Sequence, residues 1–131
     1  MPHVEQASFD IPGGVEAPAE ARLAVDELSL GYSDETRETL RLLVSELVTN
    51  SVRHAGAGPE RSIRVHLRAS DSRVRVEVLD DGPGFEPPHG PAEDGALNGW
   101  GLRLVGQIAD RWGVERDRLT RVWFEMEAAP G

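Results

Sequence analysis

The sequence contains no cysteine, which excludes disulfides, thiol catalysis and sulfur-ligated metal sites. It also lacks any apolar run near the ~20 residues that a membrane-spanning helix needs. Its first residues do not show the basic and then apolar pattern of a signal peptide. We therefore expect a cytoplasmic protein that does not act at a membrane.

Positive charge is scarce as well. The chain has 14 Lys and Arg residues against 23 Asp and Glu residues, a formal net charge of -9. A general nucleic-acid binder, whose affinity rests on neutralising phosphates, is therefore not expected. The 131 residues suit one domain, 1–131, and the hydrophobic share of 39% is enough for one buried core. The sequence predicts a small acidic globular domain.

Hydrophobic periodicity predicts two helices in the first half of the chain. Residues 1–7 read as a loose lead-in to a short strand around Phe9 and Ile11. A helix is expected over 17–30, and a longer one over 34–55 with Ser33 or Asp34 as its cap. The longer helix is the clearest element, because its apolar residues recur on one face. These residues are Leu40, Leu43, Val44, Leu47 and Val48.

Strict alternation of apolar and polar residues predicts two strands, 62–68 and 73–80, joined by a hairpin turn. One face of this pair is strongly charged, so helices must cover the other face. The expected fold is a two-layer α/β sandwich of the α+β class. The segment 81–98 is rich in proline and glycine and has no periodicity. A third helix is expected from near Gly101, followed by two strands within 112–126.

Two polar residues interrupt the apolar side of the long helix. Glu46 and Asn50 are four positions apart, so they lie on one helix face about 6 Å from each other. A carboxylate and an amide at the rim of a core are candidates for a polar site. Taken alone, the pair is better explained as an ordinary boundary between the buried and exposed sides of a helix.

The second predicted strand ends at Asp80, which is also the first residue of a D-x-G-x-G motif. Asp80 has the same parity as Val76 and Val78, so continuing the strand points its carboxylate into the helix-covered layer. A buried carboxylate needs hydrogen-bond donors, and a purine amino group is one such donor. The alternative is that Asp80 only caps a turn. Gly82 and Gly84 would let the backbone approach a ligand closely.

A third motif, G-x-G-L from Gly99 to Leu102, opens the expected third helix. Free N–H groups at a helix start attract anions, and glycine lets a phosphate come near. Loop flexibility alone would also explain the two glycines. The motif is neither a dinucleotide fingerprint nor a Walker loop, because the required strand and the G-K-[ST] ending are missing.

The order of these three motifs resembles the GHKL superfamily of ATP-binding domains. More narrowly, SELVTNSVRHAG, VEVLDDGPGF and GLRLVGQIADRWGV are similar to the small bacterial anti-sigma-factor serine/threonine kinases, in their actinobacterial stand-alone form. The similarity runs from about Phe9 to Met126. It implies the Bergerat ATP-binding fold, with a mixed, mostly antiparallel sheet and helices on one face, and residues 85–98 as an ATP lid.

The resemblance also implies roles for individual residues. Asp80 matches the acid that accepts a hydrogen bond from the adenine amino group, in a pocket shaped by Gly82 and Gly84. Asn50 matches the ligand of a Mg²⁺ ion that bridges the phosphates, and Glu46 the catalytic general base. Mg²⁺ prefers such oxygen ligands, and a base one turn from the metal ligand can reach an attacking hydroxyl.

The resemblance also implies which residues face the phosphates of ATP. Gly99, Gly101 and Leu102 match the junction between lid and helix that faces the phosphates. Arg53 lies on the Glu46 side of its helix and could also face them, although a solvated arginine fits its position equally well.

Two positions depart from the family pattern. Arginine often stands between the two glycines of the G-x-G motif, where this chain has Trp100. The last strand usually begins with a Gly-Lys-Thr-like turn, whereas this chain reads Leu119-Thr120-Arg121. We therefore expect the threonine that supports the adenine site to be displaced or missing.

The length of 131 residues limits which member of the superfamily this chain can resemble. Beside an ATP-binding domain, we expect no room for the phosphoacceptor domain of a sensor histidine kinase or for the transducer domain of the large ATPases. The resemblance implies an enzyme that uses ATP and Mg²⁺ to phosphorylate a STAS-type anti-anti-sigma protein, sequesters a sigma factor and forms a homodimer. The alternative is a non-catalytic ATP-binding protein that sequesters a regulatory partner. The retained Glu46 favours the enzyme, and the altered turn at 119–121 favours the binder.

Overall fold

The computed structural model describes residues 4–28, 30–54, 62–80, 97–116 and 118–131. It confirms an α+β sandwich of two layers, with three helices against a five-stranded sheet. The strands are β1 (Glu5–Pro12), β2 (Ser62–Ala69), β3 (Arg73–Asp80), β4 (Arg111–Arg116) and β5 (Thr120–Glu127). The helices are α1 (Ala17–Asp26), α2 (Asp34–His54) and α3 (Leu97–Ile108).

Every pair of neighbouring strands in the sheet is antiparallel, in the order β1-β2-β3-β5-β4. The expectation of a mixed sheet is therefore wrong. The chain crosses from β3 through α3 to β4, which runs parallel to β3 in the manner of a β-α-β crossover. Because β5 then folds back between β3 and β4, the two parallel strands are not neighbours.

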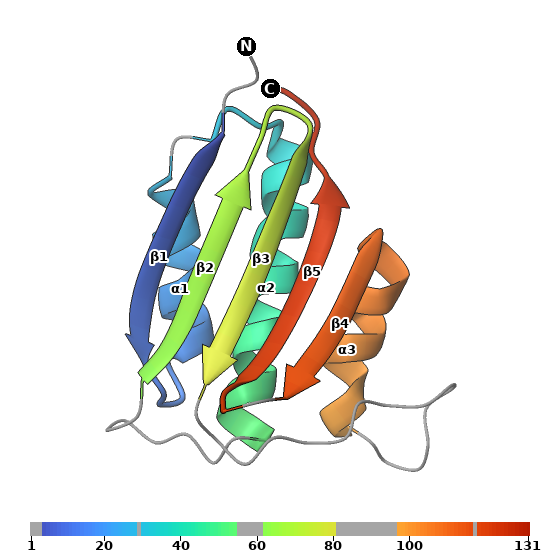
Figure 1. Cartoon of the computed structure of the whole chain (residues 1–131). Helices are drawn as coiled ribbons and strands as arrows, with labels where there is room; N and C mark the ends of the chain where they lie inside the picture. The colour runs from blue at the N-terminus through green and yellow to red at the C-terminus, as the bar shows by residue number, and fades with distance from the viewer. Residues whose placement is uncertain (1–3, 29, 55–61, 81–96, 117) are drawn as a thin grey trace.

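One face of the sheet carries all three helices, as predicted (Figure 1). Alternate residues of β2, β3 and β5 turn toward the helices and are fully buried, as Leu67, Val76 and Phe124 illustrate. They pack with the apolar stripe of α2 in one hydrophobic core, where each large side chain stabilises the fold by about 1.5–3 kcal/mol. None of the described helices has the length and apolar character needed to cross a membrane.

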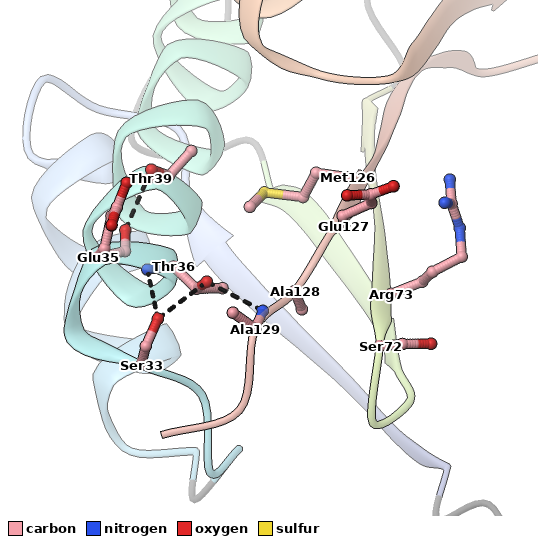
Figure 2. A pocket seen from close by; sticks show the side chains of 10 residues that line it. All are labelled: Ser33, Glu35, Thr36, Thr39, Ser72, Arg73, Met126, Glu127, Ala128 and Ala129. Atoms are coloured by element: carbon pink, nitrogen blue, oxygen red, sulfur yellow. Dashed lines mark hydrogen bonds between the residues drawn. The ribbon is translucent and has the colours of Figure 1, made fainter.

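The beginning of α2 is tied to the end of the chain. The Thr36 N–H donates to the Ser33 hydroxyl at 3.2 Å, which makes Ser33 the cap of the helix. The Thr36 hydroxyl in turn accepts from the N–H of Ala129 at 3.1 Å (Figure 2). At the opposite end of the molecule, the last turns of α2 lie beside the end of β3 and the start of α3 (Figure 1). The described parts of the three sequence motifs therefore meet at one end of the sandwich.

Several predicted boundaries were wrong. The strand β1 begins at Glu5 and not after a lead-in over 1–7, because its whole length pairs with β2. The helix α1 ends at Asp26, and the apolar Leu28 and Leu30 pack against the core from beyond it. The helix α3 begins at Leu97, so residues 97 and 98 of the expected lid belong to it. The remaining lid residues, 85–96, lie outside the described part of the chain.

Candidate functional site

The carboxylate that ends β3 lies on the helix-covered face of the sheet. Asp80 is 5% exposed and follows Val76 and Val78 in the alternation of buried residues along β3. This confirms the predicted inward direction and excludes a solvent-exposed turn cap. A buried carboxylate is costly unless donors surround it, and Asp80 already takes part in an interaction within the fold. Because a carboxylate has room for several hydrogen bonds, it can also accept one from a ligand that offers N–H groups.

A second buried polar residue lies directly across from Asp80. Thr120, the first residue of β5, pairs with Asp80 in the sheet register and is 3% exposed. The expectation that the altered turn displaces threonine from the site is therefore wrong. Thr120 shares the parity of Val122 and Phe124, so extending that alternation back along the strand would have placed its hydroxyl inside. A hydroxyl can both donate and accept beside the carboxylate.

The amide of Asn50 is buried and unsatisfied. This residue of α2 is 4% exposed, and neither its Oδ1 nor its Nδ2 has a hydrogen-bond partner among the described residues. Buried amides are almost always hydrogen-bonded, so this one requires a partner other than the described residues.

The orphaned amide oxygen fits Mg²⁺. Mg²⁺ takes hard oxygen ligands and is usually held by one or two protein groups together with phosphates and water. Within the described residues, no three His, Asp or Glu side chains come together as a metal site built by protein alone. Asn50 Oδ1 is thus suited to be the protein ligand of a magnesium–phosphate complex.

The other predicted residues of α2 and α3 are placed as follows. Glu46 lies one turn before Asn50 and is half-buried, whereas Arg53, near the end of α2, is exposed. Leu102 is part of the hydrophobic core, at 1% exposed. The structure therefore brings Glu46 and Asn50 onto one helix face, and it leaves the Arg53 side chain in solvent.

The structure describes the glycines of only one of the two predicted glycine motifs. Gly99 and Gly101 lie within the first two turns of α3 and not in front of it. This helix contacts α2, and its first turn has N–H groups without partners inside the helix. Gly82 and Gly84 lie outside the described residues.

A cavity of 560 Å³ lies elsewhere, between the start of α2 and the end of β5 (Figure 2). Thr36 and Met126 line it, and none of the predicted site residues does. Roughly 20 Å of helix separates Thr36 from Asn50. This cavity is therefore not the candidate site, which consists of Asp80, Thr120, Asn50 and Glu46.

Comparisons with known proteins point to one family. The histidine kinase-like ATPase domain matches residues 11–126 of the chain. The serine-protein kinase RsbW of Listeria innocua is 29% identical over 120 residues, which cover 81% of this chain and 76% of the relative.

Two solved structures are similar to this chain. The crystal structure of the RsbU and RsbW domains of a Mycobacterium tuberculosis protein has a TM-score of 0.72 at 18% identity, a likeness of fold. The match covers 97% of this chain and 34% of that one, so this chain spans about a third of its length. A histidine kinase domain from a blue-light activated kinase of Erythrobacter litoralis has a TM-score of 0.52 at 28% identity, over 88% of this chain and 61% of that one.

Proposed function

Because the chain belongs to the histidine kinase-like ATPase domain family, we propose that it is an ATP-dependent serine/threonine protein kinase. Its substrate is a STAS-type anti-anti-sigma protein, and it also sequesters a sigma factor, so that phosphorylation regulates transcription by partner switching. The cytoplasmic location and the homodimer implied by the resemblance are part of this proposal. The relatives named serine-protein kinase RsbW support it.

The observation that carries the proposal is the set of buried polar groups where α2, β3 and β5 meet at one end of the sandwich. Asp80, Thr120 and Asn50 are each 5% exposed or less, and Asn50 lacks any partner among the described residues. Packing of the core does not require these polar side chains, because burying apolar side chains of the same size would cost less free energy. Their types match the parts of ATP in order, from the base to the phosphates.

In the proposed mechanism, the adenine amino group donates a hydrogen bond to the Asp80 carboxylate beside the Thr120 hydroxyl. Asn50 Oδ1 holds Mg²⁺, which when bound neutralises charge on the phosphates. Glu46 accepts the proton of the substrate Ser or Thr hydroxyl. The hydroxyl oxygen forms a bond to the γ-phosphorus, the bond to the β-phosphate oxygen breaks, and ADP leaves with that electron pair.

The non-catalytic alternative rested on the altered turn at 119–121. Since Thr120 lies opposite Asp80, that turn no longer argues against a complete adenine site. A pure binding protein also has no use for a half-buried carboxylate one turn from the orphaned amide. Both observations favour the kinase.

Two measurements on the purified protein test the proposal. ATP with Mg²⁺ at about 100 times its Kd is expected to stabilise the folded state by ~2.7 kcal/mol, raising the Tm by several degrees. Incubation with γ-labelled ATP and the STAS proteins encoded near its gene is expected to label a Ser or Thr of one of them. A Tm increase without label transfer would favour the non-catalytic binder, and the absence of both at millimolar ATP would contradict the nucleotide site.

A further inference from the structure

The face of the sheet that the helices leave open (Figure 1) carries a cluster of arginines. A cavity of 280 Å³ on this face is lined by Arg68 of β2 and by Arg73 and Arg75 of β3, with Glu125 of β5 as its acid. Figure 2 shows the Arg73 side chain directed away from Met126 and from α2. The cluster thus lies on the side of the sheet opposite to Asp80 and the core.

The strand register places two of these arginines directly opposite each other. Arg68 pairs with Arg75 across β2 and β3, and Arg75 pairs with Glu125 across β3 and β5. Like charges in directly opposed positions destabilise a sheet. A chain with a formal net charge of -9 has ample acidic residues, yet none of those described is paired with Arg68.

The second member of this pair, Arg75, is held firmly in place. Its guanidinium donates to Glu125 at 2.7 Å and to Glu77 at 2.9 Å, and it stacks on the Trp123 ring at 4.2 Å from the centroid. Arg75 and Glu125 therefore form a rigid floor of the cavity, with the Trp123 ring holding Arg75 in place from outside it, and this floor loses little conformational entropy when a partner binds.

The first member has no such neighbours. The Arg68 side chain is exposed, and no hydrogen bond or ion pair joins its guanidinium to any other described residue. Arg73 reaches carboxylates only at 3.6 Å, on Asp110, and 3.9 Å, on Glu125. By contrast Arg64, on the same strand and the same face, is paired with Asp10 at 3.1 Å. Arg68 thus brings an unpaired guanidinium to the cavity, beside the weakly paired Arg73.

We propose that this cluster, Arg68, Arg73 and Arg75, is a docking site for an acidic segment of a partner protein. Carboxylates of that segment accept hydrogen bonds from Arg68 and Arg73 and relieve the repulsion between Arg68 and Arg75. Three arginines line this cavity, and arginine is one of the residues enriched in protein-interface hot spots. The site is independent of the nucleotide site, because the sheet separates the two.

A fluorescein-labelled hexaglutamate peptide tests the proposal by anisotropy. The wild-type protein is expected to bind the peptide at low ionic strength, and binding should weaken steeply as salt is added. Arg68→Glu is expected to lower the affinity at least about tenfold. Arg64→Glu makes the same change of charge on the same strand and should keep most of the affinity. Neither variant should change ATP binding, so a failure here is distinct from a failure of the kinase proposal.

The docking site would be overturned if the wild type did not bind the peptide at low salt, or if Arg68→Glu and Arg64→Glu lost equal affinity. Competition by free citrate as effective as that by the peptide would also overturn it and would indicate a site for small anions. A dimer that Arg68→Glu dissociates, without any peptide binding, would instead indicate an interface between copies of the chain. Arg68→Gln, which only removes the charge, should also weaken binding. It supplies the answer if the reversed charge impairs folding, which circular dichroism would reveal.

Discussion

Replacing Glu46 with alanine is expected to lower the rate of phosphoryl transfer to the partner protein by roughly 10²–10⁴-fold, the usual contribution of a general base. ATP binding should be retained, because the adenine contacts at Asp80 and Thr120 are on other elements. Single-turnover transfer from γ-labelled ATP measures the first effect, and calorimetric titration with ATP measures the second. Loss of rate without loss of affinity is the signature of a group that acts only in the transition state.

Two further variants of α2 make this result specific. Glu46→Gln keeps the size and shape of the side chain but cannot take up the proton, so it should be as slow as the alanine variant. Glu38→Ala removes an exposed acid from the same helix and should transfer at the wild-type rate. Transfer at full rate by Glu46→Gln would remove Glu46 from the role of base.

Replacing Asp80 with asparagine is expected to weaken ATP binding by about 10–100-fold, the value of one hydrogen bond to a buried charged group. Asparagine has nearly the same volume, so the core around β3 should remain intact. At the ATP concentration used for the wild type, the Tm increase should therefore fall to about half or less, while the circular dichroism spectrum without nucleotide stays the same.

Asp71→Asn is the matched control, because it makes the same chemical change in the exposed turn between β2 and β3. It should bind ATP with wild-type affinity. If Asp80→Asn kept its full affinity for ATP, the adenine would not be read by this carboxylate, and the role assigned to Asp80 would have to be abandoned.

The layers of the fold could be predicted from the sequence, but several element boundaries could not. Two patterns can be recognised from residues that are close together in the sequence. They are the alternation along β3, which includes Val76 and Val78, and the apolar stripe of α2. The start of β1 at Glu5 depends on pairing with Ala69, far along the chain. The all-antiparallel order likewise depends on where β5 inserts between β3 and β4, which no local pattern encodes.

The candidate site also has features that the sequence predicts and features that depend on the three-dimensional fold. The inward direction of Asp80 follows from strand parity alone, and it was predicted. The pairing of Asp80 with Thr120 requires the register between β3 and β5, and it was missed. That both polar atoms of Asn50 lack partners among the described residues depends on which residues surround the end of α2. The juxtaposition of Arg68 and Arg75 is again a matter of register.

The most direct test of the nucleotide site changes the ligand and leaves the protein as it is. Inosine triphosphate differs from ATP by a carbonyl oxygen in place of the 6-amino group, so an acceptor would face the Asp80 carboxylate where ATP presents a donor. Calorimetric titration of the wild-type protein in Mg²⁺ is expected to show at least about tenfold tighter binding of ATP than of inosine triphosphate. Equal affinities would contradict the recognition of adenine at the end of β3.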